Sequence, residues 1–252
     1  MALTNQRVWL TGASSGIGEA LVGPLVRAGA RVMVSARRPD ALAAIAARYP
    51  GDVVQSLPVD VTNRRAVAEA AREIEGRWGG IDLAIFNAGT HIPVDGTSIN
   101  ADDFESLIRV NYLSIIYGVE AVLPGMLARG RGHIAGVASL AGYRALPTAA
   151  AYGASKAAAI LALDALRFDL EPRGIAVTVI NPGFVRTPLT DRNRFAMPAL
   201  IDADKAADII VSGLQRRKKE IHFPARFSWM MKLLRVLPYP VFERLVSRTT
   251  RR

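Results

Sequence analysis

The sequence Thr11-Gly12-Ala13-Ser14-Ser15-Gly16-Ile17-Gly18 joins a short apolar run at 7–10 to a helical pattern at 19–28. Its three glycines allow a tight turn and leave room for a ligand close to the backbone. The amides and positive dipole at the start of the following helix favour a bound anion such as a pyrophosphate. Three glycines alone are weak evidence, because tight turns use glycine throughout proteins. Their position on the first strand-to-helix turn of an alternating chain favours dinucleotide binding.

Beyond this turn, apolar runs typical of buried strands alternate with segments of helical periodicity. The expected strands cover 7–10, 31–35, 53–59, 83–87, 132–139, 175–180 and 220–223. The expected helices cover 19–28, 39–48, 64–78, 102–127, 150–170 and 203–216. This alternation predicts an α/β fold of the Rossmann type, a doubly wound parallel sheet of about seven strands with helices on both faces. We expect one domain over 1–252, in which 224–252 form a basic and apolar helical tail.

The composition excludes several classes of protein. The chain has 252 residues and no cysteine, which excludes disulfides, thiolate metal sites and a cysteine nucleophile. Its histidines, His91, His133 and His222, lack ligand-like spacing, so we expect no metal site. The longest run without a charged side chain has 12 residues. Because a spanning helix needs about 20 apolar residues and no signal-peptide pattern begins the chain, we expect a cytoplasmic protein without transmembrane spans.

The positive charge is concentrated towards the C-terminus. Residues 216–252 carry 11 basic and 2 acidic side chains, whereas residues 1–215 carry 21 basic and 20 acidic ones. A protein that binds nucleic acid is expected to carry basic side chains on its main body. We therefore expect no nucleic-acid partner, despite a sequence pI of about 10.5.

Six further motifs follow the glycine-rich turn in order. They are Asp60-Val61, Asn87-Ala88-Gly89, Asn111, Ser139, Tyr152-x3-Lys156 and Pro182-Gly183-x-Val185-x-Thr187. Through these motifs the chain resembles the short-chain dehydrogenase/reductase family, in its short single-domain branch. One departure is Phe86, where the family often has a first Asn before Asn-Ala-Gly. The resemblance implies an oxidoreductase with a nicotinamide cofactor, and usually a homodimer or homotetramer formed through long helices.

The resemblance also implies which residues bind the cofactor. They are Gly12, Ser14, Ser15, Gly16, Ile17, Gly18, Asp60, Val61, Asn87, Ala88, Gly89, Tyr152, Lys156, Pro182, Gly183, Val185 and Thr187. An acidic side chain at the end of the second strand would bind a ribose 2′-hydroxyl and repel a 2′-phosphate. Ala36 stands there instead, and the guanidinium groups of Arg37 and Arg38 can bind phosphate. We expect NADP(H) in preference to NAD(H); the alternative is that both arginines are solvated cations at a helix start.

Tyr152 and Lys156 are four residues apart in a predicted helix, so their side chains share one face. Carbonyl reduction needs a proton donor at oxygen as hydride reaches carbon, and alcohol oxidation needs the reverse. An ammonium about 4 Å away supplies roughly 4 kcal/mol at an effective dielectric of about 20, enough to lower a phenol pKa by about three units. We expect Lys156 to act on Tyr152 in this way. The resemblance implies that Ser139 holds the substrate oxygen and that Asn111 supports a proton relay.

In this family the segments that follow the fourth, fifth and sixth strands set the substrate, here 90–96, 140–148 and 184–200. The substrate candidates are Ser139, Leu140, Tyr143, Tyr152, Phe184 and Leu189. The mainly apolar composition of the three segments favours a hydrophobic ketone or secondary alcohol. A rival function is a cofactor-sensing regulator, which would need no proton donor. The full set of four catalytic candidates favours an enzyme.

The tail beyond Pro224 places apolar side chains at helical spacing, among them Phe227, Met231 and Leu234, with Lys232 and Arg235 between them. Basic residues beside an apolar surface fit a helix on an anionic membrane, which would suit a reductase of a lipid-like or steroid-like carbonyl. The alternative, which the sequence favours slightly, is a lid or subunit-contact helix whose arginines face the solvent.

Overall fold

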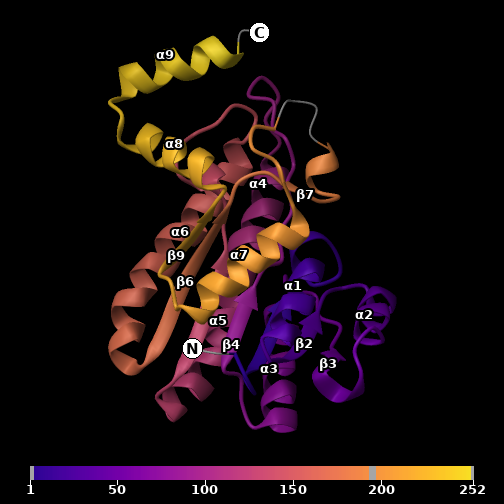
Figure 1. Ribbon diagram of the computed structural model, residues 1–252. Coiled ribbons are helices and arrows are strands. Elements are labelled where there is room, and N and C mark those ends of the chain that lie inside the picture. Colours follow the sequence, from indigo (N-terminus) through magenta and orange to yellow (C-terminus); the bar gives the residue numbers. More distant parts are fainter. Residues whose placement is uncertain (1–2, 193–196, 251–252) are drawn as a thin grey trace.

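The chain forms a parallel sheet covered by helices in a computed structural model that describes residues 3–192 and 197–250 (Figure 1). The strands are β1 (Arg7–Thr11), β2 (Arg31–Ser35), β3 (Val54–Ser56), β4 (Leu83–Phe86), β5 (Gly132–Val137), β6 (Ile175–Pro182) and β9 (Glu220–Phe223). Their order in the sheet is β3-β2-β1-β4-β5-β6-β9, and every neighbouring pair is parallel. Two short strands, β7 (Val185–Arg186) and β8 (Ile201–Asp202), form a second parallel pair. The predicted fold class is confirmed.

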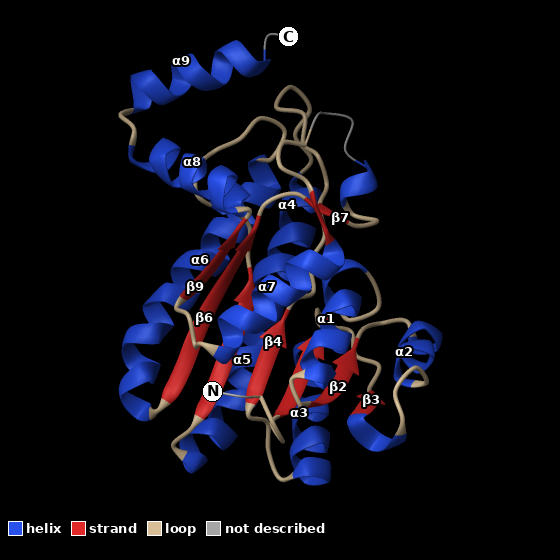
Figure 2. Ribbon diagram, viewed as in Figure 1, coloured by secondary structure: helices blue, strands red, loops and turns tan. Residues whose placement is uncertain are grey.

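Helices lie on both faces of the sheet (Figure 2). They are α1 (Gly16–Arg27), α2 (Pro39–Ala46), α3 (Arg64–Trp78), α4 (Ala101–Ile108), α5 (Ser114–Arg129), α6 (Ala150–Leu170), α7 (Ala203–Gln215), α8 (Ala225–Val236) and α9 (Tyr239–Thr250). Side chains of α1 and α7 pack in one core cluster, and those of α3, α5 and α6 pack in the other. Period-two alternation along each strand divides the strand side chains between the faces, as in β1, where Val8 and Leu10 join the first cluster and Trp9 the second.

The direction in which strands are added to the sheet reverses between β1 and β4. From β1 the sheet continues through β2 to β3 on one side, and from β4 it continues through β5 to β6 on the other. Ligands of open α/β sheets bind in the crevice outside the carboxyl ends of the strands at such a reversal. The glycine-rich turn follows β1, and Asn87 follows β4, so two of the predicted cofactor motifs lie at this point.

The predicted long helix at 102–127 is one continuous helix, Ala101–Arg129, with a π-helical turn at Arg109–Leu113 between α4 and α5. By length and composition this helix could cross a membrane. Its buried side chains Ile115, Val119 and Val122 belong to the core cluster with the sheet, however. We therefore assign it as a core helix.

Several boundaries differ from the sequence-based prediction by one to three residues, and two differences have a clear physical reason. The strand predicted at 53–59 covers only Val54–Ser56, because β3 is an edge strand that pairs with β2 over three residues. The tail forms two helices rather than one, and Pro238 separates them, since proline cannot continue the hydrogen-bond ladder of α8.

Candidate active site

The glycine-rich turn crosses the end of β4 so closely that larger residues would collide. Gly12 has a φ of +68°, and a Cβ there would lie 2.6 Å from the Cα of Ala88. A Cβ on Gly18 would lie 2.1 Å from the carbonyl oxygen of Gly12. Gly16 begins α1, and the first amides of a helix have no acceptor within it. Ser14, Ser15 and Ile17 complete a turn whose shape fits a phosphate group.

Asn87 ties the turn to the end of β4. Its side-chain amide donates to the carbonyl oxygens of Thr11, at 3.3 Å, and Gly12, at 3.1 Å. Its backbone N–H donates to the Thr11 hydroxyl at 3.2 Å. The Asn-Ala-Gly motif therefore stabilises the shape of the glycine-rich turn. Phe86, which precedes the motif, is buried in the core.

Arg38 reaches back to the glycine-rich turn. Its guanidinium donates to the carbonyl oxygen of Ser14 at 2.9 Å and to the Ser14 hydroxyl at 3.1 Å. Asp60 accepts hydrogen bonds from the backbone and hydroxyl of Thr62, which lower its pKa, and the positive charge of Arg37 adds to this effect. The Arg38 guanidinium thus lies at the glycine-rich turn, the Arg37 charge acts on Asp60, and Ala36 is buried at the end of β2. Val61, next to Asp60, is half-buried.

Asn111 lies at the centre of the π-helical turn and is fully buried. Its amide nitrogen donates to the Thr90 carbonyl at 2.9 Å and to the Ser155 hydroxyl at 3.0 Å. Its amide oxygen accepts the Thr90 N–H at 2.8 Å. Asn111 therefore joins the loop after β4 to α6, within the turn that carries Tyr152 and Lys156.

Ser139 follows β5, and its hydroxyl lies near enough to the Tyr152 phenol to favour a lower pKa of that phenol. The serine oxygen also accepts the Ala141 N–H at 3.1 Å, and its hydroxyl lies 3.5 Å from the carbonyl oxygen of Pro182. These contacts fix the serine between the segments that follow β5 and β6.

Lys156 is buried beside this pair. Its Nζ donates to the Val137 carbonyl at 2.9 Å and lies 5.8 Å from the centroid of the Tyr152 ring. A Cβ on Gly89 would lie 3.3 Å from both the Lys156 Nζ and the Asn111 Oδ1, so these two groups approach one point next to the Asn-Ala-Gly motif. The structure thus gathers Asn111, Lys156, Tyr152 and Ser139 in one cluster.

The electrostatic expectation for Tyr152 was wrong in direction. Burial raises the pKa of its phenol, and the Ser139 hydroxyl only opposes this shift. Burial also lowers the pKa of Lys156 to about 8. The reason is that the Lys156 Nζ donates to the Val137 carbonyl rather than to the phenol, so desolvation outweighs attraction between the two groups.

Three residues near this cluster were not named as candidates from the sequence, although the predicted substrate segment 90–96 contains two of them. The His91 ring makes an edge contact with the Tyr152 ring, with 4.8 Å between centroids, and burial lowers its pKa. Thr90 and Ser155 are the hydrogen-bond partners of Asn111. His91 and Thr90 directly follow the Asn-Ala-Gly motif, and Ser155 directly precedes Lys156, so adjacency to a motif was a signal that could have singled them out.

The segment after β6 closes the other side of the glycine-rich turn. A Cβ on Gly16 would lie 3.1 Å from the methyl group of Thr187. The Gly183 N–H donates to the Phe223 carbonyl at 2.7 Å, and Thr190 bonds the Val185 carbonyl at 2.7 Å. The motif Pro182 to Thr187 therefore runs from the cluster around Ser139 to the start of α1.

The substrate candidates occupy different environments. Leu140 and Tyr143 are buried in the core cluster behind the site, whereas Phe184 and Leu189 are half-buried. The Tyr143 hydroxyl donates to Glu220 and accepts from the amide of Asn181 at 3.2 Å. In the predicted segment 184–200, residues 193–196 lie outside the described residues.

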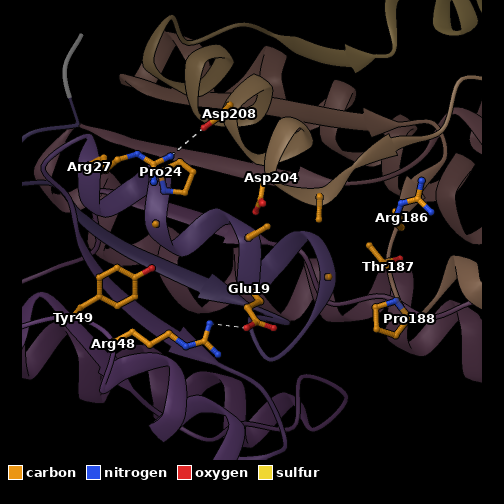
Figure 3. A pocket seen from close by; sticks show the side chains of 14 residues that line it. Glu19, Pro24, Arg27, Arg48, Tyr49, Arg186, Thr187, Pro188, Asp204 and Asp208 are labelled. Atoms are coloured by element: carbon orange, nitrogen blue, oxygen red, sulfur yellow. Dashed lines mark hydrogen bonds and ion pairs between the residues drawn. The ribbon is translucent and has the colours of Figure 1, made fainter.

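A shallow cavity of about 670 Å³ lies on the outer side of α1 (Figure 3). Its rim carries two exposed ion pairs, Arg27 with Asp208 at 3.3 Å and Arg48 with Glu19 at 2.8 Å. It contains none of the four catalytic candidates, although the lining includes Gly16 and Thr187. We assign the cluster around Tyr152, rather than this cavity, as the candidate active site.

Relatives of the chain match nearly all of its length. An uncharacterized oxidoreductase of Myxococcus xanthus (strain DK1622) is 37% identical over 241 residues, 95% of each chain. An uncharacterized oxidoreductase of Staphylococcus aureus (strain N315) is 33% identical over 216 residues, which are 86% of this chain and 94% of the relative.

Solved structures and a family model agree with these relatives. A short-chain dehydrogenase from Streptomyces avermitilis superposes with a TM-score of 0.85 at 25% identity, covering 98% of this chain and 99% of its own. A short-chain dehydrogenase/reductase from Burkholderia phymatum in complex with NAD has a TM-score of 0.85 at 23% identity, covering 92% and 94%. The model of the short chain dehydrogenase family matches residues 6–197. The chain belongs to the short-chain dehydrogenase family of oxidoreductases.

Proposed function

We propose that this chain is an NADP(H)-dependent oxidoreductase that transfers hydride between the nicotinamide and a hydrophobic ketone or secondary alcohol. The observation that carries the proposal is the meeting of Ser139, Tyr152 and Lys156 at the carboxyl edge of the sheet. Family membership supports oxidoreductase chemistry, and the NAD bound to the Burkholderia neighbour supports a nicotinamide cofactor.

The chain's own residues fit such a cofactor. The turn at Gly12 and Gly18 has no room for a Cβ, whereas Ser15, at the N-terminus of α1, is exposed and leaves that helix end accessible to a pyrophosphate. Thr187 would contact the carboxamide, and Lys156 would bond the nicotinamide ribose. The cofactor, when bound, supplies or accepts the hydride.

In the reductive direction Tyr152 donates its proton to the substrate oxygen. Its raised pKa keeps the phenol protonated at neutral pH, which is the state that a proton donor needs. Ser139 holds the same oxygen and stabilises the negative charge that develops there. In the oxidative direction Tyr152 must first release its own proton; the Lys156 ammonium stabilises the resulting phenolate, which then accepts the proton of the alcohol.

Asn111 acts by positioning. It fixes Thr90 and Ser155 on opposite sides of the cluster, and Ser155 in turn bonds the Tyr152 carbonyl at 2.7 Å. Its amide oxygen and the Lys156 ammonium approach the same point, so a water molecule there would link lysine to solvent.

The preference for NADP(H) rests on Arg37 and Arg38. Arg38 is already directed at Ser14, and Ala36 offers no carboxylate to repel a 2′-phosphate. Charge-assisted hydrogen bonds contribute about 1.5–3 kcal/mol, so Arg38→Ala is expected to lower kcat/KM about tenfold to a hundredfold for NADPH and little for NADH. A parent enzyme that prefers NADH would refute this preference.

The substrate class rests on the apolar segments around the site, and a lipid-like or steroid-like carbonyl is the variant that the basic tail favours. The rival proposal, a non-catalytic regulator that senses NADP, predicts cofactor binding without turnover. The closed cluster of four catalytic candidates favours an enzyme.

For the assembly we propose a cytoplasmic homodimer or homotetramer. Helix α6 carries Leu161 and Phe168 on its surface, 72% and 80% exposed, at a spacing of seven residues that puts them on one face. Such a pair of large apolar side chains is suited to contact with a second copy.

The test is Tyr152→Phe, which removes the proton donor and leaves the ring in place. It should bind NADPH as the parent does and lose about a hundredfold to ten-thousandfold of turnover on a panel of apolar ketones, followed by NADPH absorbance. Tyr49→Phe, outside the candidate active site, is the matched control. Turnover within about threefold of the parent would remove Tyr152 from its proposed role.

A further inference from the structure

Exposed apolar side chains gather on the two C-terminal helices. Of 11 large hydrophobic side chains exposed in the described part of the chain, seven lie between 229 and 245. Four of these seven belong to α8: Trp229, Met230, Leu233 and Val236, with exposed fractions of 63%, 46%, 61% and 74%. Single scattered apolar side chains on a surface are normal, whereas a group of them in one place marks an interaction site.

Helix α8 is apolar on two sides, and only one is covered. Its inner side packs on the body through Phe227, Met231 and Leu234, and the Phe227 ring lies 5.7 Å from that of Phe184. The four exposed side chains follow a spacing of one, four and seven residues, which places them along one stripe of the helix. We call this stripe, Trp229, Met230, Leu233 and Val236, the outer face of α8.

Basic groups border the outer face. Arg226 and Arg235 are exposed at its two ends, and the Lys232 Nζ lies 5.2 Å from the Trp229 ring. The Lys232 ammonium also bonds Glu220 at 2.6 Å, so that carboxylate is already neutralised. Within 225–246, which the structure describes fully, Glu243 is the one acidic residue. The surroundings of the outer face are therefore positive.

A lid and a second copy of the chain both fit poorly here. A lid would cover its apolar side by packing on the body. The inner side of α8 already packs there through Phe227 and Met231, so a lid does not explain why the outer face is apolar and exposed. A second copy would bring two positive surfaces together, which is unfavourable. The apolar face of α6, with Leu161 and Phe168, offers a better subunit contact.

We propose that the outer face of α8 docks on an anionic lipid bilayer. Helix α8 would lie in the interface with its four apolar side chains among the acyl chains, while Arg226 and Arg235 meet anionic headgroups. Trp229 beside Lys232 matches the aromatic and cationic pairing found at such interfaces. Both helices lie at the end of the molecule towards which the strands point, the end that carries the candidate active site (Figure 2). This docking goes beyond the proposed reaction and does not depend on it.

The experiment uses the full chain and vesicles of phosphatidylcholine, alone or mixed with phosphatidylglycerol. The chain should float with the mixed vesicles and much less with the neutral ones, and added salt should weaken the binding. Trp229 is the most exposed of the three tryptophans, because Trp9 is fully buried and Trp78 is partly buried. Binding should therefore shift tryptophan emission to shorter wavelength, and Trp229→Phe should remove most of the shift.

Point variants on the outer face keep the packed side of α8 intact. Trp229→Ser with Leu233→Ser should weaken partitioning at least tenfold, and Arg226→Glu should weaken it about tenfold on anionic vesicles only. The matched controls are Ile99→Ser, equally exposed in the loop after β4, and Arg131→Glu, directly before β5 at the amino ends of the strands. Both should bind as the parent does.

Three results would overturn the proposal. The first is equal recovery of parent and Trp229→Ser/Leu233→Ser from anionic vesicles. The second is binding without any change in Trp229 emission, which would mean that another surface docks. The third is an absence of vesicle binding combined with a smaller oligomer for the double variant in sedimentation, which would assign the outer face of α8 to a contact between subunits.

Discussion

Lys156 is expected to lower the free energy of unfolding, because its charge is buried. The variant Lys156→Met measures the size of this effect. The Lys156 side chain is 3% exposed, and burial lowers its pKa from 10.5 to about 8. That difference corresponds to about 3 kcal/mol lost at neutral pH by keeping the buried amine charged. Methionine has a similar shape and no charge, but it leaves the Val137 carbonyl without the lysine hydrogen bond, which costs about 1 kcal/mol. The variant should therefore be about 2 kcal/mol more stable than the parent at pH 7.

The pH dependence gives this prediction its signature. Below pH 8 the lysine is protonated in both folded and unfolded chains, so the full cost is present. Between pH 8 and 10.5 the folded chain has released the proton and the unfolded chain still binds it, so parent stability rises with pH. The advantage of Lys156→Met should disappear by about pH 10. Above that pH the tyrosines with raised pKa values, Tyr143 and Tyr152, begin to act in the opposite direction.

The assay is urea unfolding of both proteins at one protein concentration, at intervals from pH 7 to pH 10. Lys205→Met, on the exposed side of α7, is the control and should leave the pH dependence unchanged. Turnover should be lost in Lys156→Met even though the fold is more stable. A variant that is less stable than the parent at pH 7, or a stability difference that does not change with pH, would refute the reasoning.

Four other predictions concern stability. Gly12→Ala should unfold at lower temperature and lose NADPH binding, because its Cβ would meet Ala88; Gly76→Ala, in the open interior of α3, should gain about 0.5–1 kcal/mol. Burial lowers the pKa of His133 to about 4, so on acidification the unfolded chain binds a proton there before the folded chain does. The free energy of unfolding of the parent should therefore fall by about 3 kcal/mol between pH 6.5 and pH 4. In His133→Gln, the free energy of unfolding from urea titrations should change less over that range. Asp82→Asn should cost about 1–3 kcal/mol at pH 7, and this difference should vanish on acidification through the lowered pKa of Asp82; an unchanged difference at pH 2 would contradict it.

The sequence was sufficient for the parts of the fold that depend on local patterns. Strand and helix alternation predicted the sheet, and motif order predicted that Ser139, Tyr152 and Lys156 would meet. Ser139 follows the carboxyl end of β5, and Tyr152 and Lys156 lie in the first turns of α6. The topology of the fold brings these two places together. Local patterns do not extend to the hydrogen-bond partners, however.

Hydrogen bonds between residues far apart in the sequence could not be predicted from local patterns. The Val137 carbonyl competes with Tyr152 for the Lys156 ammonium, and only the packing of α6 against β5 decides that competition. Tyr143 and Glu220 are 77 residues apart, and nothing in either neighbourhood predicts their hydrogen bond. The break after α8, in contrast, follows a local signal, because Pro238 cannot continue the helix.

The π-helical turn at Arg109–Leu113 places a constraint on chain length. Asn111 reaches Thr90 from inside a continuous helix because that turn holds one residue more than an ordinary α-helical turn. Each residue of an α-helix rotates the next side chain by about 100°, so deleting one residue from α4 would carry Asn111 to a different side. Insertions and deletions in the loop at 92–100 can be absorbed, since that segment has no regular structure, whereas those between 101 and 111 should detach the loop after β4 from α6.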